Sequence, residues 1–170
     1  MIKELIFRRQ SPGIAVPQDL AALEAKLGVR FPPALVEFCS RWNGGFPSNV
    51  NRFYPVPPSF KEFYSEYKLG KGVYVDILFG ATDQLPHCSL LKECTLIGEY
   101  SKIAIPISVD LFGDRVILRP DSPTGTVYWW DHILWEESER PYLIPIAQDL
   151  ESFYNSLTSE PVEYLKNRKK

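Results

Sequence analysis

The sequence predicts an α+β domain with a mostly antiparallel sheet. Apolar residues recur at helical spacing before residue 43 and again near the C-terminus, whereas they alternate with a period of two in several segments between residues 73 and 130. Helices first, strands next and a helix last are typical of this class. The chain has 170 residues, 45% of them hydrophobic, and shows neither a linker nor an internal repeat. We therefore expect residues 1–170 to form a single domain.

Two helices are predicted after a short N-terminal arm. The first lies behind Pro17 and ends at Gly28, which suits a left-handed C-terminal cap. The second follows the two prolines at positions 32 and 33 and ends at Asn43-Gly44-Gly45. Their apolar faces are formed by Leu20, Leu23 and Leu27 in the first helix and by Leu35, Phe38, Cys39 and Trp42 in the second.

A strand, a short helix and another strand are expected in the middle of the chain. Apolar residues at alternate positions predict one continuous strand over residues 73–79. Residues 83–93 favour a short helix, in which Pro86 must lie near the start. Alternation over residues 103–109 predicts the next strand. Pro106 places that strand at a sheet edge or at a bulge, because proline cannot donate a ladder hydrogen bond.

The last elements are a hairpin and a helix. Residues 115–119 and 126–130 are predicted strands, joined by a loop rich in turn residues. The closing helix is indicated by a helical stripe formed by Ile146, Leu150, Phe153, Tyr154 and Leu157.

Composition narrows the classes of function. Nineteen basic residues against 21 acidic ones give a net charge of -2, so the chain as a whole has no strong attraction for nucleic acid or anionic lipid. No run of about 18 apolar residues occurs, and Met1–Arg9 lacks the apolar stretch of a signal peptide, which favours the cytoplasm. Cys39, Cys88 and Cys94 are compatible with reduced thiols rather than a disulfide framework.

Candidates for catalysis or metal binding are few. The two histidines, His87 and His132, lie in no known nucleophile motif. His87-Cys88 and Cys94 supply three zinc ligands, but a fourth is missing, and the alternative is a buried cysteine beside a surface histidine. No catalytic residue, metal or cofactor is therefore assigned.

Asp110, Asp114, Asp131 and His132 are expected at the ends of three neighbouring strands. In that position they could together hold a hard cation for a hydrolytic reaction. The alternative is that Asp110 and Gly113-Asp114 form a tight turn and that Asp131 ends a strand, which are common roles of acidic residues.

The distribution of charge is more informative than its total. Residues 76–139 have a net charge of -7, so the rest of the chain has +5. Such an acidic region speeds encounter with a basic protein and repels nucleic acid, although it also fits a surface that only keeps the protein soluble. The acids are Asp76, Asp83, Glu93, Glu99, Asp110, Asp114, Asp121, Asp131, Glu136, Glu137 and Glu139, and the bases are Lys92, Lys102, Arg115 and Arg119.

The aromatic run Tyr128-Trp129-Trp130 also invites a ligand-binding interpretation, because flat rings stack on sugars and bases. Alternation along a strand turns Trp129 and Trp130 to opposite faces, so at least one of them is expected in the core. An exposed Trp130 or Trp135 would suit a protein interface.

Four blocks of sequence resemble, in order, the Smi/Knr family of the SUKH superfamily over about residues 17–158. The blocks are residues 23–38 (LEAKLGVRFPPALVEF) with 42–45 (WNGG), 105–107 (IPI) with 112–114 (FGD), 125–132 (GTVYWWDH) and 146–153 (IAQDLESF). The resemblance implies an α+β fold with helices packed on one side of a mainly antiparallel sheet. It implies no catalytic set: bacterial members are largely immunity proteins against toxins of polymorphic and contact-dependent systems, many of them nucleases or deaminases. Fungal members are regulators linked to cell-wall synthesis.

We therefore expect a non-enzymatic, cytoplasmic immunity protein that neutralises a cognate toxin domain by binding it. The alternative is a regulatory scaffold that joins cellular proteins. Neither nucleic acid nor a membrane is an expected partner, and the segments 53–67 and 86–94 have no assigned role. The residues expected to contact the partner are Asp110, Asp114, Trp130, Asp131, Trp135, Glu136, Glu137 and Glu139.

Overall fold

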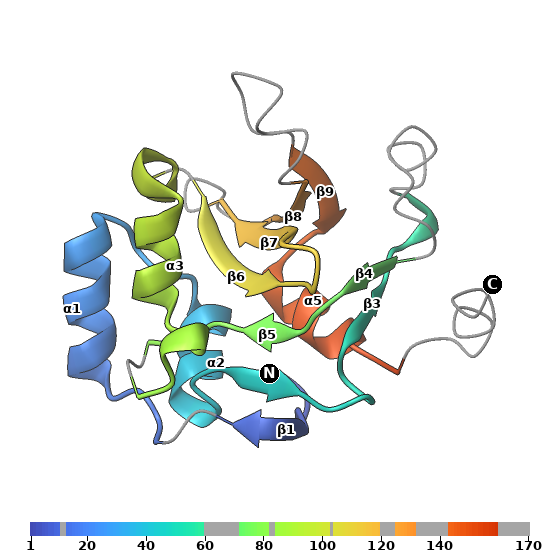
Figure 1. Ribbon diagram of the computed structural model, residues 1–170, viewed down its shortest axis with the longest axis horizontal. Coiled ribbons are helices and arrows are strands. Elements are labelled where there is room, and N and C mark those ends of the chain that lie inside the picture. Colours follow the sequence, from blue (N-terminus) through green and yellow to red (C-terminus); the bar gives the residue numbers. More distant parts are fainter. Residues whose placement is uncertain are drawn as a thin grey trace.

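The computed structural model describes residues 1–10, 13–59, 72–81, 84–102, 104–119, 125–131 and 143–159. Within these residues, seven strands form one antiparallel sheet in the order β1-β2-β5-β6-β7-β8-β9, and β3 and β4 form a separate pair (Figure 1). The main sheet consists of β1 (Phe7–Gln10), β2 (Gly45–Pro47), β5 (Ile77–Leu78), β6 (Ile105–Val109), β7 (Arg115–Leu118), β8 (Val127–Trp130) and β9 (Leu143–Ala147). The other elements are β3 (Phe53–Pro55), β4 (Gly72–Tyr74) and the helices α1 (Pro17–Leu27), α2 (Pro33–Arg41), α3 (Leu90–Leu96) and α5 (Leu150–Ser156). The predicted α+β class is confirmed.

The first two helices lie where the sequence predicts them. Gly28 caps α1 with a φ of 69°, a left-handed conformation that favours glycine. After α2, Asn43 and Gly44 both have positive φ, and the Asn43 side chain accepts a hydrogen bond from the backbone of Ala81. Gly44 passes so close to Gly80 that a Cβ on Gly44 would lie 2.8 Å from the Gly80 nitrogen. The end of α2 is therefore held directly against the strand region that follows β5.

The predicted continuous strand over residues 73–79 is wrong. The chain forms β4 and β5 instead, and the two strands belong to different sheets. Between them the backbone changes partner: Val75 N–H donates to the carbonyl of Arg52, whereas Asp76 N–H donates to the carbonyl of Val109. Both strands are extended, so the alternation of apolar residues continues across a break that only the pairing partners reveal.

Pro106 lies at a bulge and not at an edge. β6 is the central strand of the seven described, and its register with β7 shifts between Pro106 and Ser108. The bulge accommodates the missing proline N–H inside the sheet, so only one of the two predicted alternatives is confirmed. The neighbouring hairpin of β7 and β8 is confirmed as predicted.

Two helical predictions have shifted boundaries. Ile146 belongs to β9, and α5 begins only at Leu150, where the Asp149 side chain accepts a hydrogen bond from Ser152 N–H at 2.6 Å. Pro86 begins a short 3₁₀ helix, Pro86–Cys88, and α3 follows it with Ser89 as its N-cap. In both places a capping side chain, and not the apolar pattern, determines where the helix starts.

The main core lies between one face of the sheet and helices α2 and α5. Phe38 of α2 and Tyr154 of α5 are completely buried, and their rings stack with centroids 4.7 Å apart. The sheet contributes alternate residues of two adjacent strands to this core, namely Val116, Leu118, Val127 and Trp129. Helices α2 and α5 therefore share one face of the sheet, as expected, whereas Ile97, just after α3, packs with Ile117 and Trp130 on the opposite face.

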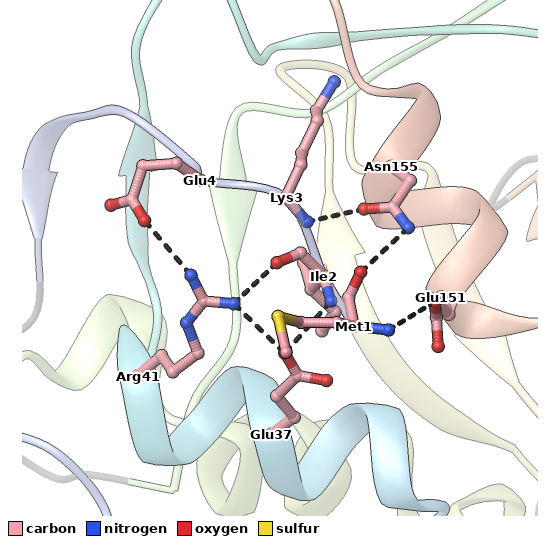
Figure 2. Close-up of polar contacts among 8 residues, drawn as sticks. All are labelled: Met1, Ile2, Lys3, Glu4, Glu37, Arg41, Glu151 and Asn155. Atoms are coloured by element: carbon pink, nitrogen blue, oxygen red, sulfur yellow. Dashed lines mark hydrogen bonds and ion pairs between the residues drawn. The ribbon is translucent and has the colours of Figure 1, made fainter.

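The N-terminal arm, residues 1–5, ties α2 to α5 (Figure 2). Ile2 N–H donates to the Glu37 carboxylate of α2 at 3.0 Å, and Lys3 N–H donates to the Asn155 side chain of α5 at 2.6 Å. Arg41 donates to the carbonyl of Ile2 at 2.6 Å. Ile2 is also buried, so this segment is an integral part of the core.

Candidate protein-binding surface at one end of the sheet

Four acidic residues line one end of the sheet. Strand register aligns four residues across β5, β6, β7 and β8, namely Ile77, Val109, Arg115 and Trp130. The next residue outward on each strand is an acid, and these four acids are Asp76, Asp110, Asp114 and Asp131. The structure therefore brings together the three predicted site aspartates that it describes. It adds Asp76, which the sequence identifies only as part of the acidic region.

The turn between β6 and β7 is held by Asp110. Its carboxylate accepts hydrogen bonds from the backbone N–H groups of Phe112 at 2.8 Å and Asp114 at 2.9 Å. Its own N–H donates to the carbonyl of Asp114 at 3.0 Å. Gly113 completes the turn with a φ of 97°. The expected tight-turn role of Asp110 and Gly113-Asp114 is thus confirmed. Both the side chain and the backbone N–H of Asp110 form hydrogen bonds that close the turn.

Arg115 connects this turn to α3. Its Nη1 donates to the carbonyl of Gly113 at 3.0 Å, and its Nε donates to the Glu93 carboxylate at 2.5 Å. The guanidinium lies 5.5 Å from the centroid of the Trp130 ring. Arg115 and Glu93 are both mostly buried, so the ion pair is shielded from solvent.

The four acids of the sheet end differ in their electrostatic surroundings. Asp76 is paired with Arg52, which offsets its charge. Asp110 has no cationic partner among its hydrogen bonds. Burial and, next, the neighbouring Asp114 carboxylate raise the pKa of Asp110 to about 6, against the lowering effect of the backbone donors. Of Asp76 and Asp110, only Asp76 therefore has its charge offset by a paired cation.

The remaining predicted site residues fall in two groups. Trp130 is buried at 3% exposure among Ile97, Ala104 and Ile117, on the sheet face opposite the main core, and it contacts Arg115 instead of solvent. Trp130 is therefore a buried residue that packs beneath the turn, and not the exposed aromatic residue that would suit a protein interface. His132, Trp135, Glu136, Glu137 and Glu139 lie outside the described residues.

The candidate metal ligands can be compared with the described part of the chain. Among the residues that the structure describes, no group of three or more His, Cys, Asp or Glu side chains is placed to hold a metal ion. Burial raises the pKa of the Cys88 thiol to about 11 and that of the Cys94 thiol to about 12. Cys88 and Cys94 are buried and His87 is exposed, which agrees with the expected alternative of a buried cysteine beside a surface histidine.

Sequence reasoning missed two features of this surface. Leu111 and Phe112, at the tip of the turn, are 68% and 66% exposed. Their position between two turn-forming acids was visible in the sequence, but their exposure was not. The ion pair of Glu93 with Arg115 joins residues 22 positions apart, and no local pattern indicates it.

The described residues form an α+β protein with a line of acidic residues at one end of its main sheet. Residues 15–156 match the model of the SMI1 / KNR4 family (SUKH-1), so the chain belongs to this family. Membership supports an immunity or regulatory role through protein–protein contacts. No curated protein and no solved structure matches the chain significantly. No helix in the described parts of the chain is long and apolar enough to cross a membrane.

Proposed function

We propose that this chain is an immunity protein that acts in the cytoplasm, where it binds and neutralises a cognate toxin domain of a polymorphic or contact-dependent system. The observation that supports this most is the line of acids at one end of the sheet, Asp76, Asp110, Asp114 and Asp131. Family membership supports the general role, and the acidic surface favours a basic partner.

A toxin that cleaves or deaminates nucleic acid has a basic cleft for its substrate. An acidic sheet end can occupy such a cleft and associate quickly, because opposite charges steer the encounter. The mechanism is inhibition by occlusion and requires no catalytic residue in this chain. Asp110, Asp114 and Asp131 are the proposed contacts within the described residues, and Trp135, Glu136, Glu137 and Glu139 are proposed to extend the surface.

The test uses the purified C-terminal domain encoded by the gene immediately upstream. Calorimetry at low and moderate salt should give nanomolar affinity that weakens as salt increases. Co-expression of this chain should also restore growth to cells arrested by that domain. Tight binding without protection would favour the regulatory scaffold, and the absence of both binding and protection would overturn the proposal.

A further inference from the structure

The tip of the β6–β7 turn exposes two large apolar side chains next to each other. Leu111 is 68% exposed and Phe112 is 66% exposed. Asp110 directly precedes them, Asp114 follows after Gly113, and Asp131 comes next after Trp130, which is the register partner of Arg115. Isolated apolar residues are common on protein surfaces, but a pair at the apex of a turn and within an acidic rim is a more specific arrangement.

The turn holds this pair in a fixed position. Asp110 receives two backbone hydrogen bonds inside the turn, one of them from Phe112 itself. Arg115 fixes the carbonyl of Gly113 from outside while it is paired with Glu93. A partner would therefore meet a tip with an ordered backbone, and binding would cost little backbone conformational entropy.

The surrounding charge selects the kind of partner. Carboxylates around an apolar tip oppose insertion into an anionic membrane and contact with nucleic acid. They also oppose self-association through this surface, because two copies would bring like charges together. A basic protein surface with an apolar recess satisfies both features of the tip.

We propose that Leu111 and Phe112 form the apolar anchor of the interface and insert into a recess on the basic face of the toxin domain. This inference rests on the function proposed above and adds the residues that keep the complex together. Acidic residues around the anchor then act mainly on the association rate, whereas the anchor acts mainly on the dissociation rate.

The test compares three proteins in binding kinetics with the same upstream-encoded domain: the wild type, the double variant Leu111→Ser/Phe112→Ser, and Ile14→Ser. Ile14 is 59% exposed and lies just before α1, outside the line of acids at the sheet end, so it controls for loss of a surface apolar group. The double variant should dissociate about 30-fold faster, a loss typical of hot-spot residues, with its melting temperature unchanged. Ile14→Ser should behave as the wild type.

Hydrogen exchange on the wild type gives a readout that needs no substitution. The amides of residues 111–113 should become protected when the domain binds. Tight wild-type binding with neither faster dissociation of the double variant nor protection at these amides would overturn the anchor and leave the immunity function intact. If the wild type does not bind the domain at all, the proposed function fails first, and the anchor fails with it.

Discussion

Arg115 and Glu93 form an ion pair beside the β6–β7 turn, with 2.5 Å between Nε and Oε1. The same guanidinium donates to the carbonyl of Gly113 and lies over the ring of Trp130. One side chain thus joins α3, the turn and the sheet face opposite the main core. Because Glu93 is only 9% exposed, removal of Arg115 would leave a buried carboxylate without its cation.

We expect Arg115→Ala to lower the free energy of unfolding by about 3 kcal/mol, measured by urea denaturation. Arg30→Ala is the matched control, since Arg30 pairs with Glu24 at 3.4 Å but its side chain is 92% exposed, and it should cost less than about 0.5 kcal/mol. Adding Glu93→Gln to Arg115→Ala should recover part of the loss. Equal losses in the Arg115 and Arg30 variants would contradict the burial argument.

Asp110→Asn should stabilise the protein at neutral pH. The folded state raises the pKa of Asp110 from 3.8 to about 6, so it favours the protonated form. The contribution of this carboxyl group to the free energy of unfolding is therefore greatest below about pH 4, and it is lost as the pH rises through 6. Asparagine keeps the acceptor oxygen and avoids the charge. We therefore expect Asp110→Asn to raise the free energy of unfolding by about 1 kcal/mol at pH 7.5, a value that already allows for solvent screening. At pH 4 it should leave the free energy of unfolding unchanged. A less stable variant at pH 7.5 would mean that hydrogen bonds to the carboxylate outweigh its desolvation.

Phe38→Ala should lower the free energy of unfolding by about 4 kcal/mol, because it removes a completely buried ring that stacks on Tyr154. Phe112→Ala removes the same atoms from a residue that is 66% exposed and should change stability by less than about 0.5 kcal/mol. Thermal or urea denaturation of both variants measures the contrast. Similar losses for the two would be incompatible with the described core.

Arg41→Ala should release the N-terminal arm. Arg41 donates to the Ile2 carbonyl and to the Glu37 carboxylate, which itself accepts from Ile2 N–H (Figure 2). We expect faster hydrogen exchange at Ile2 and Lys3 and a loss of about 1–2 kcal/mol in stability. Exchange in β7 and β8 should stay as in the wild type. An arm that exchanges no faster would show that burial of Ile2 alone holds it.

Replacing Glu136, Glu137 and Glu139 together by glutamine should slow association with the proposed toxin domain and flatten its salt dependence. This change alters the net charge by +3. The control adds the same charge on the exposed face of α1 through Gln18→Lys, Ala22→Lys and Ala25→Lys. Stopped-flow kinetics should separate the two variants. If both slow association equally, total charge and not this patch controls the encounter.

Periodicity predicted the elements with long, regular patterns. α1, α2 and the β7–β8 hairpin agree because each repeats its apolar spacing over enough residues and ends at proline, glycine or a turn. β1, β2 and β3 have only three or four residues each, and three of the four residues of β1 are exposed, so no alternation marks them. The break between Tyr74 and Ile77 depends on Arg52 and Val109 as backbone partners, which are distant in sequence.

The sequence also predicted part of the candidate surface. Asp110 and Asp114 were expected at a turn, and the expected hairpin brought Asp131 next to them. The alignment of Asp76 with these acids depends on β5 joining β6, which the wrong continuous strand obscured. The burial of Trp130 depends on contacts with Ile97 and Ala104, which come from a separate part of the chain and leave no mark in the local pattern.

The close approach of Gly80 to Asn43 affects how a saturation mutagenesis screen for protection should be interpreted. A Cβ at position 80 would lie 2.1 Å from the Asn43 carbonyl oxygen, so every substitution there must displace the backbone. Such alleles would score as failures in a growth assay even though Gly80 is buried and is not one of the proposed contacts. Measuring the amount of soluble protein for each allele would separate such structural positions from Leu111 and Phe112. Substitutions at Leu111 and Phe112 should leave the amount of soluble protein unchanged and abolish the protection of growth.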